Sequence, residues 1–321
     1  MTFGAQGGDA RPTIVFVLGV ARSGTSALAR VLSLCGGALP TALVGAMPDN
    51  PLGHWEPRAA NVLNEKILRR FGSSGFDPTL RLQEAGALDA AEQAACVEEI
   101  REFIATLPNA PFVIIKDPRI SLMTGMWFEA ARLAGFDVAA VNALRHPQEV
   151  AASVAQRSVV PPELSSALWL KVNLLTEAGT RGVPRVFVEY VNLLEDWRRE
   201  MKRVSSALGI DLGTRDESAI EEFLRPGLRH ERHNNQVTDL FGADWISTTY
   251  ETLQRAARDE SWDEAVLDRV FDEYRVNERD FRAVFDGYQR IEKANRYFRP
   301  SVMKMIYEVR ALANRRRGTW A

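Results

Sequence analysis

Residues 13–26 read TIVFVLGVARSGTS and contain three structural signals in a fixed order. The run 13–18 is almost entirely apolar and rich in β-branched residues, as is typical of a strand buried inside a parallel sheet. Gly19 and Gly24 permit a tight turn after it. Over residues 25–34 the apolar positions recur at helical spacing, and two glycines follow shortly after. The segment therefore predicts a strand, a tight loop and a helix.

A loop between a strand and a helix is an anion site, because backbone N–H groups and the helix dipole converge there. The two glycines have the spacing of a Walker phosphate loop, but Thr25 stands where that loop has its Lys, and the cation is Arg22 instead. This departure disfavours an ordinary ATPase. A cation in the loop itself would lie near the bridging oxygen, where leaving-group charge builds up. The residues predicted to bind a phosphate here are Gly19, Arg22, Ser23, Gly24, Thr25 and Ser26.

Three further apolar runs, at residues 112–115, 138–144 and 186–188, predict buried strands. Amphipathic stretches with helical spacing occur before, between and after them. These predicted helices lie near residues 59–71, 86–107, 120–134, 147–157, 164–180 and 193–208. The alternation predicts an α/β fold of P-loop NTPase type with a doubly wound parallel sheet.

The chain is expected to have three regions. Residues 1–12 are Gly-rich and polar and predict a loose tail. Residues 13–230 would form the α/β core, with a helix-rich insert at about 72–107. Residues 231–321 would form a helical C-terminal extension packed on the core, with a break around Pro300.

Charge and cysteine content exclude several classes of protein. The 321 residues carry 40 basic and 42 acidic side chains, intermixed along the chain, which argues against a nucleic-acid partner. Cys35 and Cys96 stand apart from other Cys and His residues, so we expect buried thiols rather than a zinc site or a disulfide. The sequence shows no signal peptide and no membrane-spanning run, which predicts a cytoplasmic protein.

The chain closes on the basic cluster 315–317. Such a cluster can make a weak peripheral contact with an anionic membrane, although it is more often a solvated helix end. The sequence carries no signal for an oligomeric state.

Two motifs resemble those of the sulfotransferases that use 3'-phosphoadenosine-5'-phosphosulfate (PAPS). Residues 22–26 are similar to that family's 5'-phosphosulfate loop, in which Lys or Arg precedes Ser-Gly-Thr. Residues 145–153, RHPQEVAAS, resemble its 3'-phosphate motif, an Arg at a strand end followed by a Ser on the next helix. Arg145 offers a planar fork to a phosphate, and Pro147 can start the helix that carries Ser153.

The resemblance spans roughly residues 13–230. The segment 186–194 is similar to the strand and turn that follow the 3'-phosphate helix, and Arg229 lies in a stretch that resembles the basic loop closing over the nucleotide. Many cytosolic members have a Trp that stacks on adenine where this chain has Ala27. That departure favours the bacterial and carbohydrate-type branches and leaves open which residue contacts the base.

The resemblance implies an enzyme that moves a sulfuryl group from PAPS to a hydroxyl or amine and releases adenosine 3',5'-bisphosphate (PAP). No metal is expected. The acceptor would be a carbohydrate, a lipid or a small metabolite, because nothing in the sequence selects among them.

The acceptor side needs a base, and some family members carry a catalytic His where this chain has Pro118. Glu56, in the loop after the first helix, resembles the base of members that act on sugars. His54 is the alternative base, because histidine is a common general base in enzymes. Trp55, between these two residues, is suited to stacking on an acceptor, although a place in the core fits it equally well.

The strand end at 116–119 supplies two more candidates. Lys116 resembles the family's strand-end lysine, which stabilises charge on the sulfuryl oxygens, and Arg119 would bind the acceptor or the same group. Asp117 would pair with one of these cations. An ion-pair cluster without chemistry is the alternative interpretation of all three residues.

Two other functions compete with this one. A P-loop nucleotide kinase or NTPase is the first, because Asp117 loosely imitates a magnesium-binding acid at a strand end. The second is a binding module that keeps the PAP site and catalyses nothing.

Overall fold

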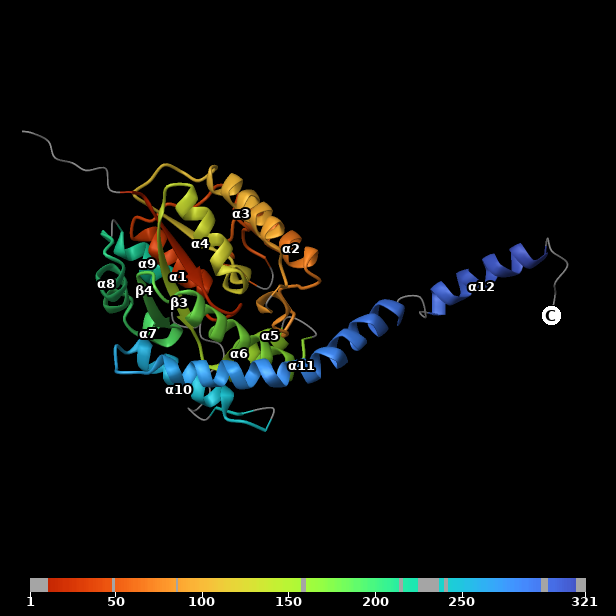
Figure 1. Cartoon of the computed structure of the whole chain (residues 1–321). Helices are drawn as coiled ribbons and strands as arrows, with labels where there is room; N and C mark the ends of the chain where they lie inside the picture. Colours follow the sequence, from red (N-terminus) through yellow and green to blue (C-terminus); the bar gives the residue numbers. More distant parts are fainter. Residues whose placement is uncertain are drawn as a thin grey trace, which may run out of the picture. The chain divides into compact units, whose positions relative to one another are not determined.

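The computed structural model describes residues 11–47, 50–84, 86–156, 160–213, 216–224, 237–239, 242–295 and 300–315. Within these residues four strands form one parallel sheet in the order β2-β1-β3-β4. Figure 1 shows helices around this sheet. The strands are β1 (Thr13–Leu18), β2 (Phe112–Lys116), β3 (Asp137–Leu144) and β4 (Arg185–Glu189). The predicted parallel α/β sheet is therefore confirmed.

Twelve α-helices and two short 3-10 helices accompany this sheet in the described part of the chain. The helices before β4 are α1 (Thr25–Leu34), α2 (Arg58–Arg70), α3 (Ala90–Ile104), α4 (Thr124–Leu133), α5 (Pro147–Ala155) and α6 (Pro162–Gly179). Those after it are α7 (Tyr190–Glu195), α8 (Trp197–Leu208), α9 (Glu217–Phe223), α10 (Trp245–Ala257), α11 (Glu264–Asn295) and α12 (Pro300–Arg315). The 3-10 helices are η1 (Arg81–Gln83) and η2 (Pro118–Leu122).

The helix predicted over 193–208 is two helices in the structure. Asp196 interrupts it with an extended backbone, and its side chain accepts a hydrogen bond from the Arg199 backbone N–H at 3.0 Å. A carboxylate in this position caps the start of a new helix. Asp196 therefore ends α7 and begins α8.

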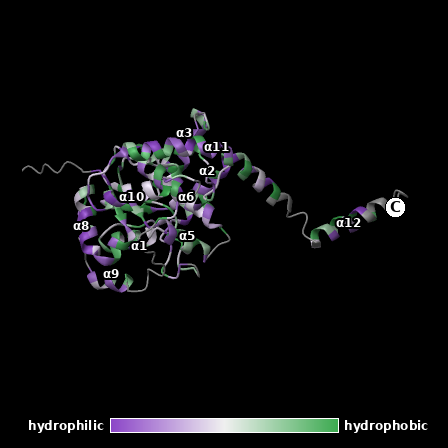
Figure 2. Cartoon of the chain, turned by 90° about the horizontal axis from the view of Figure 1, so that it is seen from below, coloured by the Kyte–Doolittle hydropathy of each residue, from purple (hydrophilic) through white to green (hydrophobic). Residues whose placement is uncertain are grey.

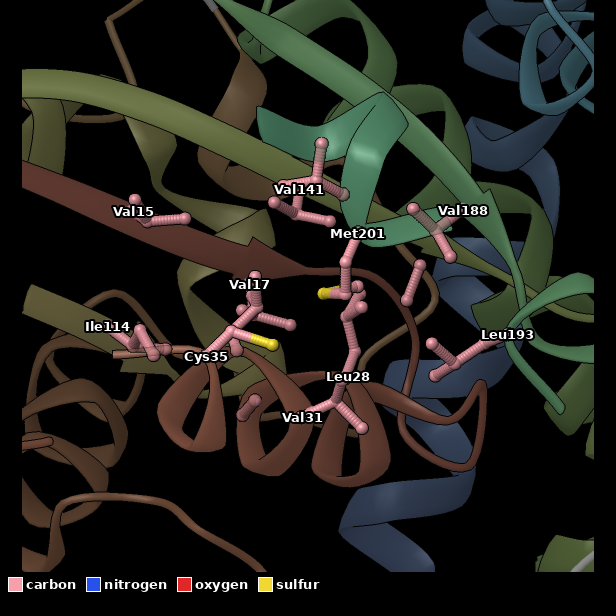
Figure 3. Packing of buried hydrophobic residues seen from close by; sticks show 14 of the residues in the cluster. Val15, Val17, Leu28, Val31, Cys35, Ile114, Val141, Val188, Leu193 and Met201 are labelled. Carbon is pink, nitrogen blue, oxygen red and sulfur yellow. The ribbon is translucent and has the colours of Figure 1, made fainter. Parts of the chain in front are cut away.

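Both faces of the sheet are covered, because successive side chains of β1 point to opposite sides. Val15 and Val17 belong to a buried cluster with residues of α1 and α8, including Leu28 and Met201 (Figure 3). On the other face the Phe16 ring lies 5.1 Å from that of Phe128 on α4, between centroids. The expected doubly wound arrangement follows from these two layers.

The two cysteines are buried free thiols, as the sequence predicted. Cys35 belongs to the same cluster as Val15 and Val17, next to the end of α1. Cys96 lies on α3, where Arg70 donates a hydrogen bond to its sulfur at 3.2 Å. Burial raises the pKa of the Cys96 thiol, which keeps it protonated.

β1 lies between β2 and β3 in the sheet. The chain therefore continues from β1 to β2 on one side of β1, and then crosses to β3 on the other side. In open parallel sheets, ligands bind outside the carboxyl ends of the strands at such a switch point. The loop 19–24 follows β1, Lys116 ends β2, and Arg145 and Tyr190 directly follow β3 and β4. These residues therefore meet at one edge of the sheet.

The chain divides into two compact units, Met1–Phe271 and Asp272–Ala321. The helix α10 belongs to the first unit, and α12 in the second begins at Pro300, where a break was predicted. Hydrophobic and hydrophilic residues both occur along α11 and α12 (Figure 2). Among the described residues, no helix has both the length and the apolar character needed to cross a bilayer. Arg316 and Arg317 lie outside the described residues, so the weak membrane contact stays a prediction.

We expect Gly19→Ala to lower the free energy of unfolding by about 1–3 kcal/mol. Gly19 has a φ of 129°, and an added Cβ would lie 2.6 Å from the carbonyl oxygen of Ala143. Gly125→Ala on α4 is the matched control, because nothing lies within 4 Å of its added Cβ. Urea denaturation of both variants checks this, and equal stability would contradict the close approach.

Candidate active site

The loop after β1 is built to surround an anion. Gly24 has a φ of 88° and is the N-cap of α1, and no side chain caps this helix. The first N–H groups of the helix therefore remain for a ligand. The hydroxyl of Ser23 is buried and has no hydrogen-bond partner among the described residues. An orphaned buried hydroxyl beside an uncapped helix start fits a phosphate oxygen.

Arg22 holds a backbone conformation that is strained for its residue type. Its φ is 76°, in the left-handed region that favours glycine. Two contacts fix it: the carbonyl of Arg22 accepts a hydrogen bond from Arg145 Nη1 at 3.1 Å, and its Nε donates to Ser153 Oγ at 3.2 Å. Strain of this kind persists where the surroundings over-determine it, most often at functional sites.

Arg145 is held rigidly at the end of β3. Its Nε donates to Glu149 on α5 at 2.9 Å, and its backbone carbonyl accepts from Trp169 Nε1 at 3.0 Å. The guanidinium also lies 4.9 Å from the centre of the Tyr190 ring. Only 7% of Arg145 is exposed, so its charge acts in a low-dielectric environment. Arg145 and Ser153 thus lie next to Arg22 of the phosphate loop, while their contacts with two phosphates stay predictions.

Lys116 and Glu56 form a buried ion pair on the other side of the loop, although they lie sixty residues apart. Lys116 Nζ also reaches the Ser26 hydroxyl at 3.4 Å and the His54 carbonyl at 3.3 Å. Asn61 Nδ2 donates to the second carboxylate oxygen of Glu56 at 2.8 Å. The pair links the end of β2 to the phosphate loop and to the loop 41–57.

The pKa of Glu56 is set by opposing effects. Burial alone would raise it, but the charge of Lys116, hydrogen bonds from Lys116 and Asn61, and the charge of Arg119 outweigh burial and lower the pKa below its ordinary value. Glu56 is therefore ionised at neutral pH. An ionised carboxylate in a buried position can accept a proton from a neighbouring group.

Residues 41–47 and 50–57 fold back on one another, which places Glu56 against Lys116. The Val44 backbone N–H donates to the Glu56 carbonyl at 2.7 Å, and the Val44 carbonyl accepts from the His54 N–H at 3.3 Å. The amide of Asn50 donates to the Gly53 carbonyl at 2.7 Å, and the Ser26 hydroxyl donates to the His54 carbonyl at 3.2 Å. These contacts tie the loop to the start of α1.

A cavity of about 250 Å³ joins these two groups of residues. The predicted site residues that line it are Arg22, Gly24, Thr25, Ser26, His54, Glu56, Lys116 and Arg145. Asn50, Tyr190 and Phe223 also line it, although the sequence did not identify them as site residues. Tyr190 packs so closely on Gly24 that an added Cβ would collide with its ring.

Of the predicted residues, Gly19, Ser23 and Ser153 do not line this cavity, and the two that were predicted to contact the acceptor have other surroundings. Trp55 lies outside this lining: its ring stacks 4.6 Å from the Arg30 guanidinium, and its Nε1 donates to the Leu52 carbonyl at 3.0 Å. Arg119 pairs with Asp117 at 3.0 Å and with Glu65 at 3.4 Å. The acceptor roles predicted for both residues stay predictions. Arg229 lies outside the described residues.

Asp117 belongs to a buried polar network. Its carboxylate accepts hydrogen bonds from Asn64 at 2.9 Å and from the Arg119 backbone at 2.9 Å, and Asn64 in turn accepts from Trp127. Burial raises the pKa of Asp117, against the charge of Arg119, and the charge of Glu56 adds to the rise. The predicted pairing of Asp117 with a cation is present, with Arg119 as the partner. No cluster of three or more potential metal-ligating side chains occurs among the described residues.

No model of a known protein family and no curated protein sequence matches the chain. Among solved structures, it is similar to the sulfotransferase domain of the olefin synthase from Synechococcus PCC 7002, with 19% identity, a TM-score of 0.42, and coverage of 83% of this chain and 96% of that domain. Retinol dehydratase in complex with androsterone and the inactive cofactor PAP gives 16% identity and a TM-score of 0.36 over 67% of this chain and 65% of its own. A sulfotransferase from Mycobacterium tuberculosis has 15% sequence identity and a TM-score of 0.35, over 67% of this chain and 71% of its own. These scores are low, so the function is inferred from the chain's own residues.

We expect Glu56→Gln to lower the free energy of unfolding at neutral pH by about 1–3 kcal/mol, because it leaves Lys116 buried without its counter-charge. The pKa of Glu56 is lower in the folded state than its ordinary value of 4.5. The contribution of Glu56 to stability is therefore fully present above pH 4.5 and is lost as the pH falls through the pKa of the folded state. The stability difference between wild type and variant should therefore shrink below that pH. Urea denaturation at several pH values measures it, and a constant difference would contradict the ion pair.

Proposed function

We propose that the chain transfers a sulfuryl group from PAPS to a hydroxyl or amine and releases PAP. The observation that carries the proposal is one cavity lined by an uncapped helix start with Arg22 and Arg145 and, next to them, by the ion pair of Glu56 and Lys116. The first group suits a nucleotide with two separate phosphate positions. The second suits the removal of a proton from an acceptor.

The nucleotide would be held from three directions. The backbone of the loop 22–26 would bind the 5'-phosphate, with the buried Ser23 hydroxyl as a further donor. Arg145, with Ser153, would bind the 3'-phosphate, because its guanidinium is rigidly oriented and lines the cavity. Phe223 is the candidate for contact with the adenine, since it is an aromatic residue of the lining and Ala27 offers no ring.

In the proposed reaction the acceptor atom bonds to sulfur while the bond from sulfur to the 5'-phosphate oxygen breaks. Glu56 takes the proton of the acceptor, and PAP leaves with the electron pair of the broken bond. Lys116 neutralises charge on the sulfuryl oxygens, and Arg22 neutralises charge on the leaving oxygen. As Lys116 turns from Glu56 towards the sulfuryl group, the pKa of Glu56 rises, which makes it a stronger base when it is needed.

The kinase alternative has less support. The loop has Thr25 where a nucleotide kinase has its Lys. Asp117, the candidate magnesium ligand, is buried and engaged by Asn64 and Arg119. Its hydrogen bonds account for its position without a metal.

We expect PAP to stabilise the protein, by about 2.7 kcal/mol at 100 times its Kd. Arg145→Lys keeps a positive charge beside Glu149 but loses the planar guanidinium. The variant should therefore bind PAP about tenfold more weakly. Adenosine 5'-monophosphate lacks the 3'-phosphate, and its binding should not change. Thermal-shift titration measures both ligands.

The control is Arg132→Lys, an exposed position on α4. Stabilisation by Mg-ATP without stabilisation by PAP would overturn the sulfotransferase proposal in favour of the kinase. PAP binding with no transfer to a panel of sugars, amines and alcohols would favour the binding module.

Glu56→Gln should lower kcat by about 10²–10⁴-fold and leave PAP binding unchanged, because Gln cannot take the proton of the acceptor. Release of PAP from PAPS in the presence of the acceptor panel measures kcat. Glu129→Gln, exposed on α4, is the control. His54→Gln separates the two candidate bases: if it abolishes transfer and Glu56→Gln does not, His54 is the base.

A further inference from the structure

A second cavity, of about 70 Å³, lies next to the first and shares Ala21 and Pro118 with its lining. Its walls come from the loop after β1, residues 75 and 76, η2, α5 and α6. Neither the sequence motifs nor the proposed nucleotide site accounts for it. Pro118 stands two residues after Lys116, so this cavity borders the place where the transferred group would lie.

The lining of this second cavity is apolar. The buried side chains that line it include Val20, Leu122, Val150, Leu168 and Val172. Among the described residues of its wall, Arg119 and Ser165 carry the polar side-chain groups. Arg119 pairs with Asp117 and Glu65, and its buried Nε has no hydrogen-bond partner among the described residues. A sugar placed here would leave several hydroxyls without partners, at a cost for each.

Phe76 extends the apolar wall outwards. It lines the cavity, and 60% of it is exposed. A hydrocarbon body that fills the cavity would also cover this ring, because both surfaces gain by leaving water together. The cavity is small, so the bound body is slim.

Resting on the proposed function, we propose that the acceptor is an alcohol borne on a slim hydrocarbon body, and that this cavity holds the body. The hydroxyl would then lie at the junction of the two cavities, beside Ala21 and Pro118, and face Glu56 and Lys116. Its oxygen bonds to sulfur, its proton passes to Glu56, and PAP leaves. This acceptor differs from the sugar that the carbohydrate-type branch suggested.

The test uses PAPS with straight-chain primary alcohols from ethanol to octanol, and with glucose as the polar competitor. In the wild type, kcat/KM should rise about fourfold for each added methylene until the cavity is full, and glucose should be a poor acceptor. Val172→Phe fills the cavity and should remove this rise, so that kcat/KM for the longer alcohols falls by about tenfold or more. The kcat/KM for ethanol and the affinity for PAP should not change.

Phe76→Ala is the second variant, because truncation of this exposed side chain leaves the buried core intact. Leu133→Ala, 62% exposed on α4, is its control. Phe76→Ala should lower kcat/KM only for the longer alcohols. If PAP binds but glucose is preferred, if rates do not depend on chain length, or if no alcohol reacts, the acceptor assignment is wrong while the nucleotide site stands. If PAP itself does not bind, the proposed function fails and this assignment fails with it.

Discussion

The position of β1 between β2 and β3 is the constraint on which the rest of the site depends. Because all four strands are parallel, their carboxyl ends meet at one edge, and each end contributes a different group. The phosphate loop follows β1, Lys116 ends β2, and Arg145 follows β3. Packing on both faces, through α1 and α8 on one side and α4 on the other, keeps these groups at fixed separations.

Within that frame, the buried cations Arg145 and Lys116 are each paired with a carboxylate. Arg145 is paired with Glu149, and Lys116 with Glu56. A buried ion pair adds little stability by itself, since desolvation offsets attraction. In this protein the two pairs keep Lys116 and Arg145 in place at the cavity wall, and the lowered pKa of Glu56 keeps its carboxylate ionised. The strained backbone of Arg22 fits the same interpretation, because the contacts that hold it come from Arg145 and Ser153.

Much of the fold could be predicted because buried parallel strands are continuous apolar runs. The predicted ends of β2, β3 and β4 differ from the observed ones by no more than one residue. The helix α10 lies inside the predicted helical extension, but its bounds could not be predicted, because its buried face is partly polar: Thr249 is fully buried, and the Tyr250 hydroxyl donates to Glu189 at 2.5 Å. Apolar periodicity does not detect such a face.

The site was predictable in part for a related reason. The phosphate loop and Arg145 carry local motifs, so each could be found from neighbouring residues alone. The pairing of Glu56 with Lys116 depends on how the loop 41–57 folds back, which includes a left-handed backbone at Trp55, with a φ of 59°. Tyr190 and Phe223 enter the cavity through tertiary packing, and no local pattern marks them.

A crystal structure of the protein with PAP tests the central claim most directly, because it locates both phosphates at once. We predict the 5'-phosphate at the backbone N–H groups of residues 24–26 and the 3'-phosphate on the guanidinium of Arg145. We also predict that the side of the nucleotide where the sulfuryl group would be attached faces Lys116 and Glu56. A 5'-phosphate bound away from the loop, or a 3'-phosphate without contact to Arg145, would contradict it.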